Sequence, residues 1–234
     1  MKMGTVIRNI PRSSAETLKG LAAAGSATVH EAMGRVGLMQ PYMRPISAGA
    51  RAAGNAVTVL VHPGDNWMIH VAVELCRPGD VLVVAVSAEC HDGMFGDLLA
   101  TSLQAHGVAA LVIDAGVRDT EDLRAMQFPV WSRAISSKGT IKATLGNVNT
   151  PVVCAGAYVT AGDVIIADDD GVAVVPNGEA DATLAAAQKR VALESKKRAR
   201  LASGELGLDI ENMRPTLEQL GLKYYENLED LNRT

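Results

Sequence analysis

Three apolar runs at regular intervals constrain the fold most strongly. Residues 56–61, 81–86 and 108–113 consist almost entirely of Val, Leu, Ile and Ala, as expected for strands buried on both faces. Apolar residues at helical spacing lie between them, over 67–75 and 97–106, and each helix is followed by Gly or Pro. Strands that alternate with helices predict a layered, mixed α/β fold around one central core.

Local signals predict the remaining elements. Ser13 or Ser14 is expected to cap a helix that runs to residue 24. Thr28 and Glu31 have the spacing of a capping box, which predicts a short helix from there to Gly34. The other expectations are a connecting loop over 41–54, a short helix from residue 120, an extended segment from 129, short strands within 138–159, a strand over 161–166, a hairpin turn at 168–171 and a strand over 172–176.

The C-terminal part of the chain predicts a long helix followed by an arm. Residues 179–203 are rich in Ala, Leu, Lys and Arg, whereas 204–234 are polar with scattered Leu and Met. No linker rich in Pro, Gly or Ser divides the preceding sequence. We therefore expect a single α/β domain over 1–203 and an arm over 204–234 that packs on the core or on a neighbouring subunit.

Composition argues against several functional classes. The formal charge is −4 and aromatic residues make up 3%, so neither a basic footprint nor a base-stacking platform for nucleic acid is expected. No apolar run approaches the roughly 20 residues that cross a bilayer. Three cysteines without metal-ligand spacing predict reduced thiols. Since the N-terminus also does not resemble a signal peptide, we expect a cytoplasmic protein without a membrane partner.

The segment around Asp97 and the pair Arg118–Asp119 are the strongest candidates for chemistry. Twenty residues separate Asp97 from Arg118, and they are expected to form one helix and one return strand. That arrangement brings the helix start back to the far end of the strand. Free N–H groups and the positive dipole end at a helix start suit a carboxylate or phosphate. Taken singly, Asp119 is better explained as a helix cap than as a metal ligand, Asp97 is also a plausible cap, and Arg118 is best explained as a surface residue.

Convergence of these groups predicts a site for a keto acid. Mg²⁺ takes oxygen ligands and keeps several waters, so one carboxylate, here Asp119, can suffice with substrate oxygens. Arg118 would bind a carboxylate or stabilise an enolate. Backbone amides from Gly96 to Leu99 would hold the carboxylate of the keto acid.

These residues also resemble a known family. Gly93, Asp97, Arg118 and Asp119 have the spacing of the signature of the metal-dependent 4-hydroxy-4-methyl-2-oxoglutarate / 4-carboxy-4-hydroxy-2-oxoadipate aldolases. That family is related in fold to the regulator of ribonuclease activity A. The similarity extends over nearly the whole chain, including the segments 95–100, 112–119, 168–172 and 206–210.

The resemblance implies a fold and an activity. The fold would be a layered β/β/α sandwich like that of swivelling domains, with a C-terminal helix and arm. The activity would be retro-aldol cleavage of a hydroxy-keto diacid to pyruvate and a second keto acid, with oxaloacetate decarboxylation as a side activity. The protein would be a homotrimer or hexamer with sites at subunit interfaces.

The resemblance also implies roles for individual residues. Asp119 would be the ligand of Mg²⁺ or Mn²⁺, and Arg118 would bind the pyruvyl group and stabilise its enolate. Gly96, Asp97, Leu98 and Leu99 would cradle the substrate, with Asp97 also ordering a catalytic water. Glu31 and Glu194 match acids that approach the site from a neighbouring subunit. By their local sequence alone, Glu31 completes a capping box and Glu194 lies on a solvated helix face.

Two other functions stay open at this stage. One is a protein-binding regulator without catalysis, like the regulator of ribonuclease activity A. The other is a lyase that forms a Schiff base on Lys138 or Lys142, although nothing nearby indicates a lowered lysine pKa. None of the five histidines has zinc-ligand spacing, and His91 is the one nearest to the candidate site in sequence.

Overall fold

The computed structural model describes residues 3–233 and divides the chain into two units after Lys189. Unit 1 ends at Lys189 and contains the sheets, whereas unit 2 begins at Arg190 and is helical. The division falls inside the long helix α6, which runs from Ala180 to Ala202. The predicted arm therefore begins two residues beyond the end of this helix.

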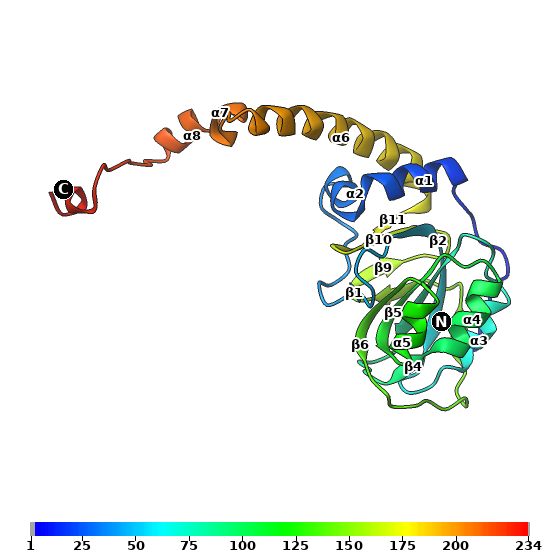
Figure 1. The fold of residues 1–234 in the computed structure, drawn as a ribbon. Coiled ribbons are helices and arrows are strands. Elements are labelled where there is room, and N and C mark those ends of the chain that lie inside the picture. Colours follow the sequence, from blue (N-terminus) through cyan, green and yellow to red (C-terminus); the bar gives the residue numbers. More distant parts are fainter. Residues whose placement is uncertain (1–2, 234) are drawn as a thin grey trace. The chain divides into compact units, whose positions relative to one another are not determined.

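Four parallel strands form the centre of unit 1, side by side in the order β6-β5-β3-β2 (Figure 1). The predicted buried strands are confirmed, and the reason for their unbroken apolar sequence is visible in β3. Leu82 and Val84 face one hydrophobic core while Val81 and Val83 face another, so neither side of the strand meets water. The strands are β2 (Ala52–Val61), β3 (Val81–Val86), β5 (Ala110–Val117) and β6 (Val130–Ile135).

Strand β2 begins within the predicted connecting loop. Its first residues, Ala52 to Asn55, pair antiparallel with β10 (Val164–Asp168), a strand from much later in the chain. Strand β5 likewise continues to Val117, because it pairs there with β6 and with the short strand β4 (Gly93–Phe95). Both extensions depend on partners distant in sequence, which local patterns do not reveal.

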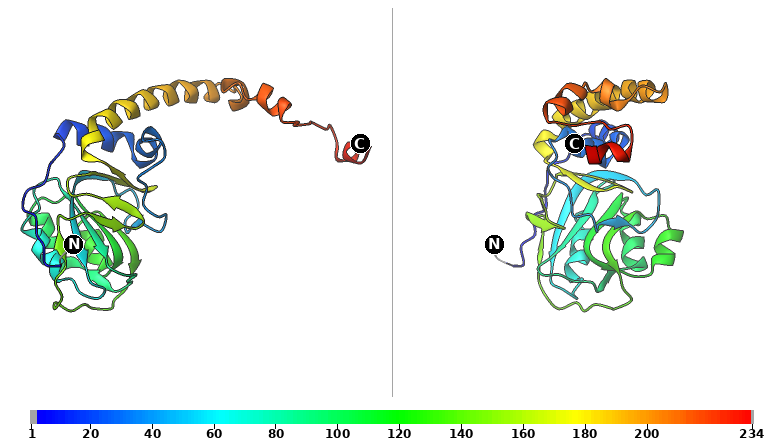
Figure 2. Two further views of the ribbon diagram at one scale, coloured as in Figure 1. Left: turned by 180° about the vertical axis from the view of Figure 1, so that it is seen from behind. Right: turned by 90° about the vertical axis from the view of Figure 1, so that its left-hand side faces the viewer.

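Helices cover one face of the parallel strands, and Figure 2 shows them together on that side of unit 1. Leu103 and Leu123 are fully buried between these helices and the sheet. Gly107, at φ +70°, follows the helix over Asp97–Ala105, as predicted. The helices are α3 (Trp67–Val73), α4 (Asp97–Ala105) and α5 (Thr120–Ala125).

The opposite face is covered by more β structure and then by a second helical layer. Strand β10 forms a hairpin with β11 (Gly171–Val175), which confirms the predicted turn at Asp168–Gly171. Ile165 packs toward the parallel strands, whereas Val164 and Ile166 pack toward α1 (Ala15–Ala24), α2 (Ser26–Ala32) and the start of α6. The predicted mixed α/β layered fold is therefore confirmed, with helices outside both β layers and a nearly closed sheet.

The predicted capping box at Thr28 is wrong. Helix α2 begins at Ser26, with Gly25 at the N-cap position and no local side-chain cap. Instead the buried carboxylate of Asp168 accepts hydrogen bonds from the backbone N and the Oγ of Ser26, at 2.8 and 2.5 Å. A cap supplied from 142 residues away has no signature in the helix's own sequence. Ser14, by contrast, caps α1 as predicted, accepting from Thr17 N.

The remaining elements of unit 1 are short. They support the edges of the sheets: β1 pairs with β6, β7 pairs with β2, and β8 pairs with β9. They are β1 (Arg44–Pro45), β7 (Asn147–Val148), β8 (Val152–Cys154), β9 (Ala157–Val159) and the 3-10 helix η1 (Asn177–Glu179).

Unit 2 consists of the remainder of α6 and three short helical segments. Helix α6 confirms the long helix predicted over 179–203. An ion pair joins Arg200 to Glu205 at the end of α6 at 2.6 Å. Among the described helices, none combines the length and the apolar character needed to cross a lipid bilayer. The short segments are α7 (Gly207–Ile210), α8 (Arg214–Gln219) and η2 (Leu228–Arg233).

Candidate active site

The candidate site lies where the parallel strands end. The loops that follow β2, β5 and β6, together with β4 and the start of α4, meet at the carboxyl edge of the sheet, at the lower end of unit 1 in Figure 1. Ligands of α/β proteins commonly bind at this edge. A cleft opens there, and Gly96, Asp97, Leu98, Leu99 and Arg118 line it. Residues predicted from sequence to form one site are thus brought together.

The N-terminus of α4 supplies backbone donors to the cleft. Its N-cap residue, Gly96, has no side chain to occupy the first amides, and Ala100 is the first residue to donate to the Gly96 carbonyl, at 3.1 Å. The amides of the first helical turn have no partner within a helix, so those of Leu98 and Leu99 are available to a ligand. Asp97 N donates to Oδ2 of Asp119 at 3.4 Å, which fixes that carboxylate at the helix start.

Arg118 and Asp119 follow directly from β5. The backbone N of Arg118 donates to the Phe95 carbonyl at 2.9 Å, and its Nε lies 3.3 Å from Oδ2 of Asp119. Asp119 adopts φ +54°, a left-handed conformation that non-glycine residues rarely occupy. It stands at the N-cap position of α5 but makes no side-chain cap bond. Its carboxylate therefore points to the α4 start instead of serving its own helix, and unusual backbone conformations of this kind cluster at functional sites.

Gly96 leaves the room that the Asp119 carboxylate occupies. A β-carbon built on Gly96 would lie 2.1 Å from Oδ2 of Asp119 and 3.1 Å from Cγ of Arg118. The φ of Gly96 is −153°, so the glycine is required by this close approach and not by its backbone conformation.

The donor set suits a hydrated hard cation better than a protein-made metal cage. Among residues 3–233, no three His, Cys, Asp or Glu side chains gather in an arrangement that could hold a metal. Mg²⁺ commonly takes only one or two carboxylates and completes its shell with water and substrate oxygens. Asp119 has an exposed carboxylate edge, with its side chain 32% accessible, and it also lines a second opening with Arg118, Ile135 and Ser136. The residues present therefore fit Mg²⁺ or Mn²⁺ in this partly hydrated form.

Three polar residues of the cleft were not predicted as substrate ligands. Asn66 follows β2, His70 lies on α3, and Lys142, considered from sequence only as a Schiff-base lysine, follows β6. Burial, and next the charge of Lys142, lower the pKa of His70, so the two side chains are close enough to interact. The signal that would have found Asn66 and Lys142 is topological, since loops after parallel strands share one edge of the sheet.

Two predicted acids form local ion pairs. Glu31 lies on α2, in the helical layer that packs on β10 and β11, and forms an ion pair with Arg35 at 3.0 Å. Glu194 lies in unit 2 and forms an ion pair with Arg190 at 2.8 Å. Glu31 lines neither opening at Arg118 of its own chain. A role for them at a neighbouring subunit's site stays a prediction.

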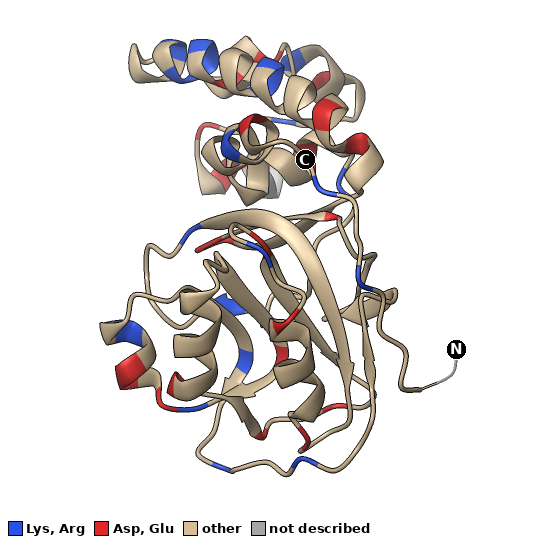
Figure 3. Ribbon diagram, turned by 90° about the vertical axis from the view of Figure 1, so that its right-hand side faces the viewer, with Lys and Arg blue, Asp and Glu red and all other residues tan. Residues whose placement is uncertain are grey.

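The other reactive side chains have local partners. His91 pairs with Glu89 at 3.6 Å, and Lys138 pairs with Asp92 at 3.0 Å. Burial raises the pKa of the Cys76 thiol to about 12, and it raises that of Cys154 as well, so both are protonated at neutral pH. Figure 3 shows charged residues of both signs in the loops at the lower end of unit 1, around the candidate site.

Comparison with known proteins identifies a family and several relatives. Residues 26–174 match the RraA-like family, described as Aldolase/RraA. A protein of Halalkalibacterium halodurans named "Putative 4-hydroxy-4-methyl-2-oxoglutarate aldolase" is 33% identical over 150 residues, which cover 64% of this chain and 71% of the relative. A Burkholderia multivorans protein of the same name is 34% identical over 143 residues, covering 61% of this chain and 87% of the relative.

A solved structure shares the fold. Streptomyces coelicolor RraAS2, described as an unusual member of the RNase ES inhibitor RraA protein family, superimposes with a TM-score of 0.71 at 25% sequence identity. The match covers 81% of this chain and 99% of that protein. The relatives therefore include proteins named as aldolases and a protein named for a family of ribonuclease inhibitors.

Proposed function

The chain belongs to the RraA-like family, and we propose that it is a divalent-metal-dependent pyruvate aldolase. Its substrate would be 4-hydroxy-4-methyl-2-oxoglutarate, 4-carboxy-4-hydroxy-2-oxoadipate or both. The observation that carries the proposal is the meeting of the Asp119 carboxylate with Arg118 Nε and with the start of α4, where Arg118 lines both the cleft at the free amides and the neighbouring opening at Asp119. The names of the aldolase relatives support the same reaction class.

The substrate is oriented by the chain's own donors. Its C1 carboxylate accepts from the amides of Leu98 and Leu99, at the positive end of the α4 dipole. Arg118 reaches the adjacent keto oxygen, where its guanidinium donates a charge-assisted hydrogen bond. This places C3 and C4 farther along the cleft.

Cleavage then requires a base at one end and charge stabilisation at the other. A water ordered by Asp97 removes the proton of the C4 hydroxyl, and the C3–C4 bond breaks with its electron pair moving to C3. C4 becomes the carbonyl carbon of the second keto acid. Arg118 stabilises the negative charge on the oxygen of the pyruvate enolate, as preorganised donors do in other enzymes. Protonation at C3 releases pyruvate.

Mg²⁺ or Mn²⁺ held at Asp119 would supply Lewis-acid polarisation of the keto group. The chain's part is to fix the carboxylate, through Asp97 N and Arg118 Nε, beside a glycine that leaves it room. Oxaloacetate decarboxylation leads to the same enolate by loss of CO₂, so we expect it as a side activity.

The alternative is a non-catalytic regulator that binds a protein, for which the name of the Streptomyces structure is the supporting observation. Pyruvate release from oxaloacetate, measured with Mg²⁺ and again with excess EDTA, separates the two. We expect turnover that depends on the metal. A protein that is inert in both conditions would support the regulator.

Three further properties belong to the same proposal. We expect a homotrimer or hexamer in which Glu31 and Glu194 approach the site of a neighbouring copy, a cytoplasmic location, and no nucleic-acid partner. Sedimentation velocity measures the assembly. Loss of activity on dilution to monomer is the result expected if the neighbouring acids contribute.

A further inference from the structure

The cleft contains three polar side chains for which the mechanism above has no use. Asn66, His70 and Lys142 line it together with Arg118 and the start of α4. Asn66 is the N-cap residue of α3 and His70 lies four residues later on the same helix, whereas Lys142 comes from the segment that follows β6. Two segments distant in sequence therefore meet at the carboxyl edge of the sheet.

Asn66 presents an unused acceptor. Its side chain is only 8% exposed, and its Nδ2 donates to the Met94 carbonyl at 3.0 Å, which fixes the orientation of the amide. Its Oδ1 is buried and has no hydrogen-bond partner within residues 3–233. Buried polar atoms without a partner are rare in native proteins, so this oxygen calls for a donor from a ligand or from an ordered water.

The ammonium group of Lys142 has no role in the mechanism above. No carboxylate among the described residues forms an ion pair with it, whereas nearby Lys138 is paired with Asp92. Burial is the main cause of the lowered pKa of His70, and the charge of Lys142 is the second. The Lys142 ammonium group therefore lies near the His70 ring. Lys142 therefore supplies a positive charge, and the uncharged His70 ring a hydrogen-bonding nitrogen, to the same cleft as Asn66.

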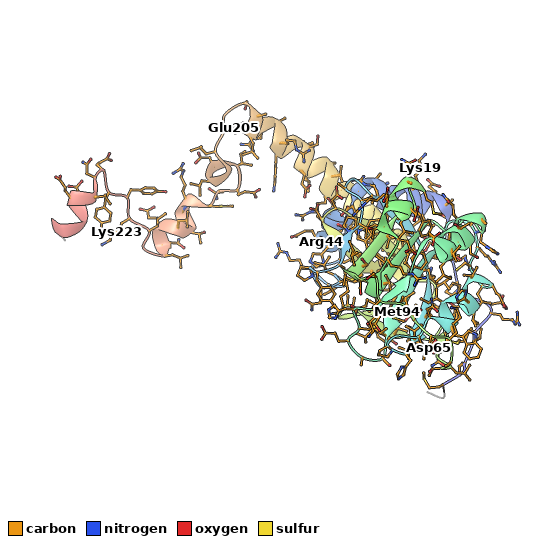
Figure 4. The ribbon with its side chains drawn as sticks, turned by 60° about the horizontal axis from the view of Figure 1, so that its bottom comes forward. Lys19, Arg44, Asp65, Met94, Glu205 and Lys223 are labelled. Atoms are coloured by element: carbon orange, nitrogen blue, oxygen red, sulfur yellow. The ribbon has the colours of Figure 1, made fainter. Side chains whose placement is uncertain are left out.

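Asp65 holds this region together. Its buried carboxylate accepts from Trp67 N, at the start of α3, and from the backbone N of Ala143 and Thr144, at 2.9, 2.8 and 2.7 Å. On the other side of Lys142, Ile141 N donates to the Gly64 carbonyl at 2.9 Å. Figure 4 shows Asp65 and Met94 at the same end of unit 1. The segment that carries Lys142 is thus anchored on both sides to the loop that carries Asn66.

We propose that Lys142 and His70 bind the second carboxylate of a 2-keto dicarboxylate, that Asn66 Oδ1 accepts from the water that removes the C4 hydroxyl proton, and that Asp65 is the residue that positions them. This rests on the proposed function, which places the keto-acid end at Arg118 and α4. The residues of both ends line one cleft, so a single ligand can contact them together. The subsite would make the site selective for diacids over monoacids.

Equilibrium binding tests this without turnover. 2-Oxoglutarate and 2-oxopentanoate have the same five-carbon keto-acid chain and differ in the far carboxylate, and neither carries the hydroxyl needed for cleavage. With Mg²⁺ present, we expect calorimetry to show the wild-type protein binding 2-oxoglutarate about tenfold more tightly, a typical effect of one charge-assisted contact. Lys142→Gln should remove that preference, and Lys138→Gln should retain it. Pyruvate, which has no second carboxylate, should bind both variants alike.

Two further variants test the other residues. Asp65→Asn should weaken the preference for 2-oxoglutarate although its side chain touches no ligand, which a purely structural role would not do selectively. Asn66→Ala should lower kcat/KM for the hydroxy-keto diacid about tenfold more than for oxaloacetate, which has no C4 hydroxyl.

The outcomes distinguish this subsite from the proposed function. Equal binding of the two five-carbon ligands by the wild-type protein, or equal weakening of pyruvate and 2-oxoglutarate by Lys142→Gln, would overturn the subsite. A preference that depends on Lys142, in a protein that releases no pyruvate from oxaloacetate, would sustain the subsite and overturn the aldolase.

Discussion

The carboxylate of Asp119 lies where a side chain on Gly96 would otherwise be. Oδ2 of Asp119 is 2.1 Å from the position of a β-carbon on Gly96, and it accepts from the next residue, Asp97 N, at 3.4 Å. The residue that follows β5 and the start of α4 are therefore so close that residue 96 has no room for a side chain. This contact joins the proposed metal ligand to the proposed carboxylate-binding amides.

Gly96→Ala tests that contact. The added methyl cannot coexist with the present position of Asp119, so we expect a loss of stability of about 1–3 kcal/mol, as for other overpacked sites, and a large loss of pyruvate release. Gly178→Ala is the matched control, because nothing lies within 4 Å of its β-carbon and its φ is not positive. Thermal unfolding and oxaloacetate turnover are the measurements. Full activity of Gly96→Ala would show that the contact is dispensable.

Asp119→Ala tests the metal. Mn²⁺ titrated against the wild-type protein should bind and be detected by electron paramagnetic resonance, because the free ion's signal falls on binding. The variant should leave the signal of free Mn²⁺ unchanged over the same range, while Asp122→Ala, on the exposed side of α5, should bind like the wild-type protein. Mn²⁺ bound equally by Asp119→Ala would refute the ligand assignment.

Asp65 predicts a pH dependence of stability. Burial would raise its pKa, but the backbone donors of Trp67, Ala143 and Thr144 outweigh that effect and leave it below the ordinary 3.8. A carboxyl whose pKa is lower when folded contributes stability above its unfolded pKa and loses it as the pH falls through the folded pKa. Asp65→Asn should therefore cost about 1 kcal/mol or more at neutral pH and progressively less below pH 3.8.

Urea unfolding at several pH values measures that difference. Asp122→Asn, at an exposed carboxylate, is the control. A penalty for Asp65→Asn that stays constant or grows on acidification would contradict the assignment of its three donors.

The contact between Arg12 and Asp80 predicts an effect on the free energy of unfolding that does not involve the candidate site. Nε and Nη2 of Arg12 donate to the two oxygens of the buried Asp80 carboxylate at 2.9 and 2.8 Å. Arg12→Ala leaves that carboxylate without its countercharge, which should cost about 2–3 kcal/mol. Arg8→Ala, an exposed arginine of the same segment, should cost little. Equal unfolding free energies for the two variants would refute the importance of this pair.

Much of this architecture could be predicted because it depends on short-range patterns in the sequence. The apolar runs of β3 and β5 and the spacing in α4 determine the helix-and-strand unit that brings Asp97 near Arg118. The local sequence also predicts that Ser14 caps α1. What failed depended on distant partners: the start of β2 requires β10, and the true cap of α2 is Asp168.

The same distinction applies to the site. Arg118, Asp119 and the amides after Gly96 belong to one contiguous segment and were predicted from it. Asn66 and His70 went unpredicted, and Lys142 was considered only as a Schiff-base lysine, because their meeting depends on how the loops after β2 and β6 fold around Asp65.

Proton exchange at the methyl group of pyruvate, followed by NMR in deuterated buffer with Mg²⁺, tests the central claim most directly. It requires only a keto acid bound beside Arg118 and stabilisation of its enolate. We predict steady exchange with the wild-type protein, a loss of about 10²–10³-fold in Arg118→Ala, as for removal of other oxyanion donors, and no loss in Arg51→Ala, an exposed arginine at the opposite end of β2. Exchange at the wild-type rate in Arg118→Ala, or none in a wild-type protein that binds pyruvate, would contradict the account.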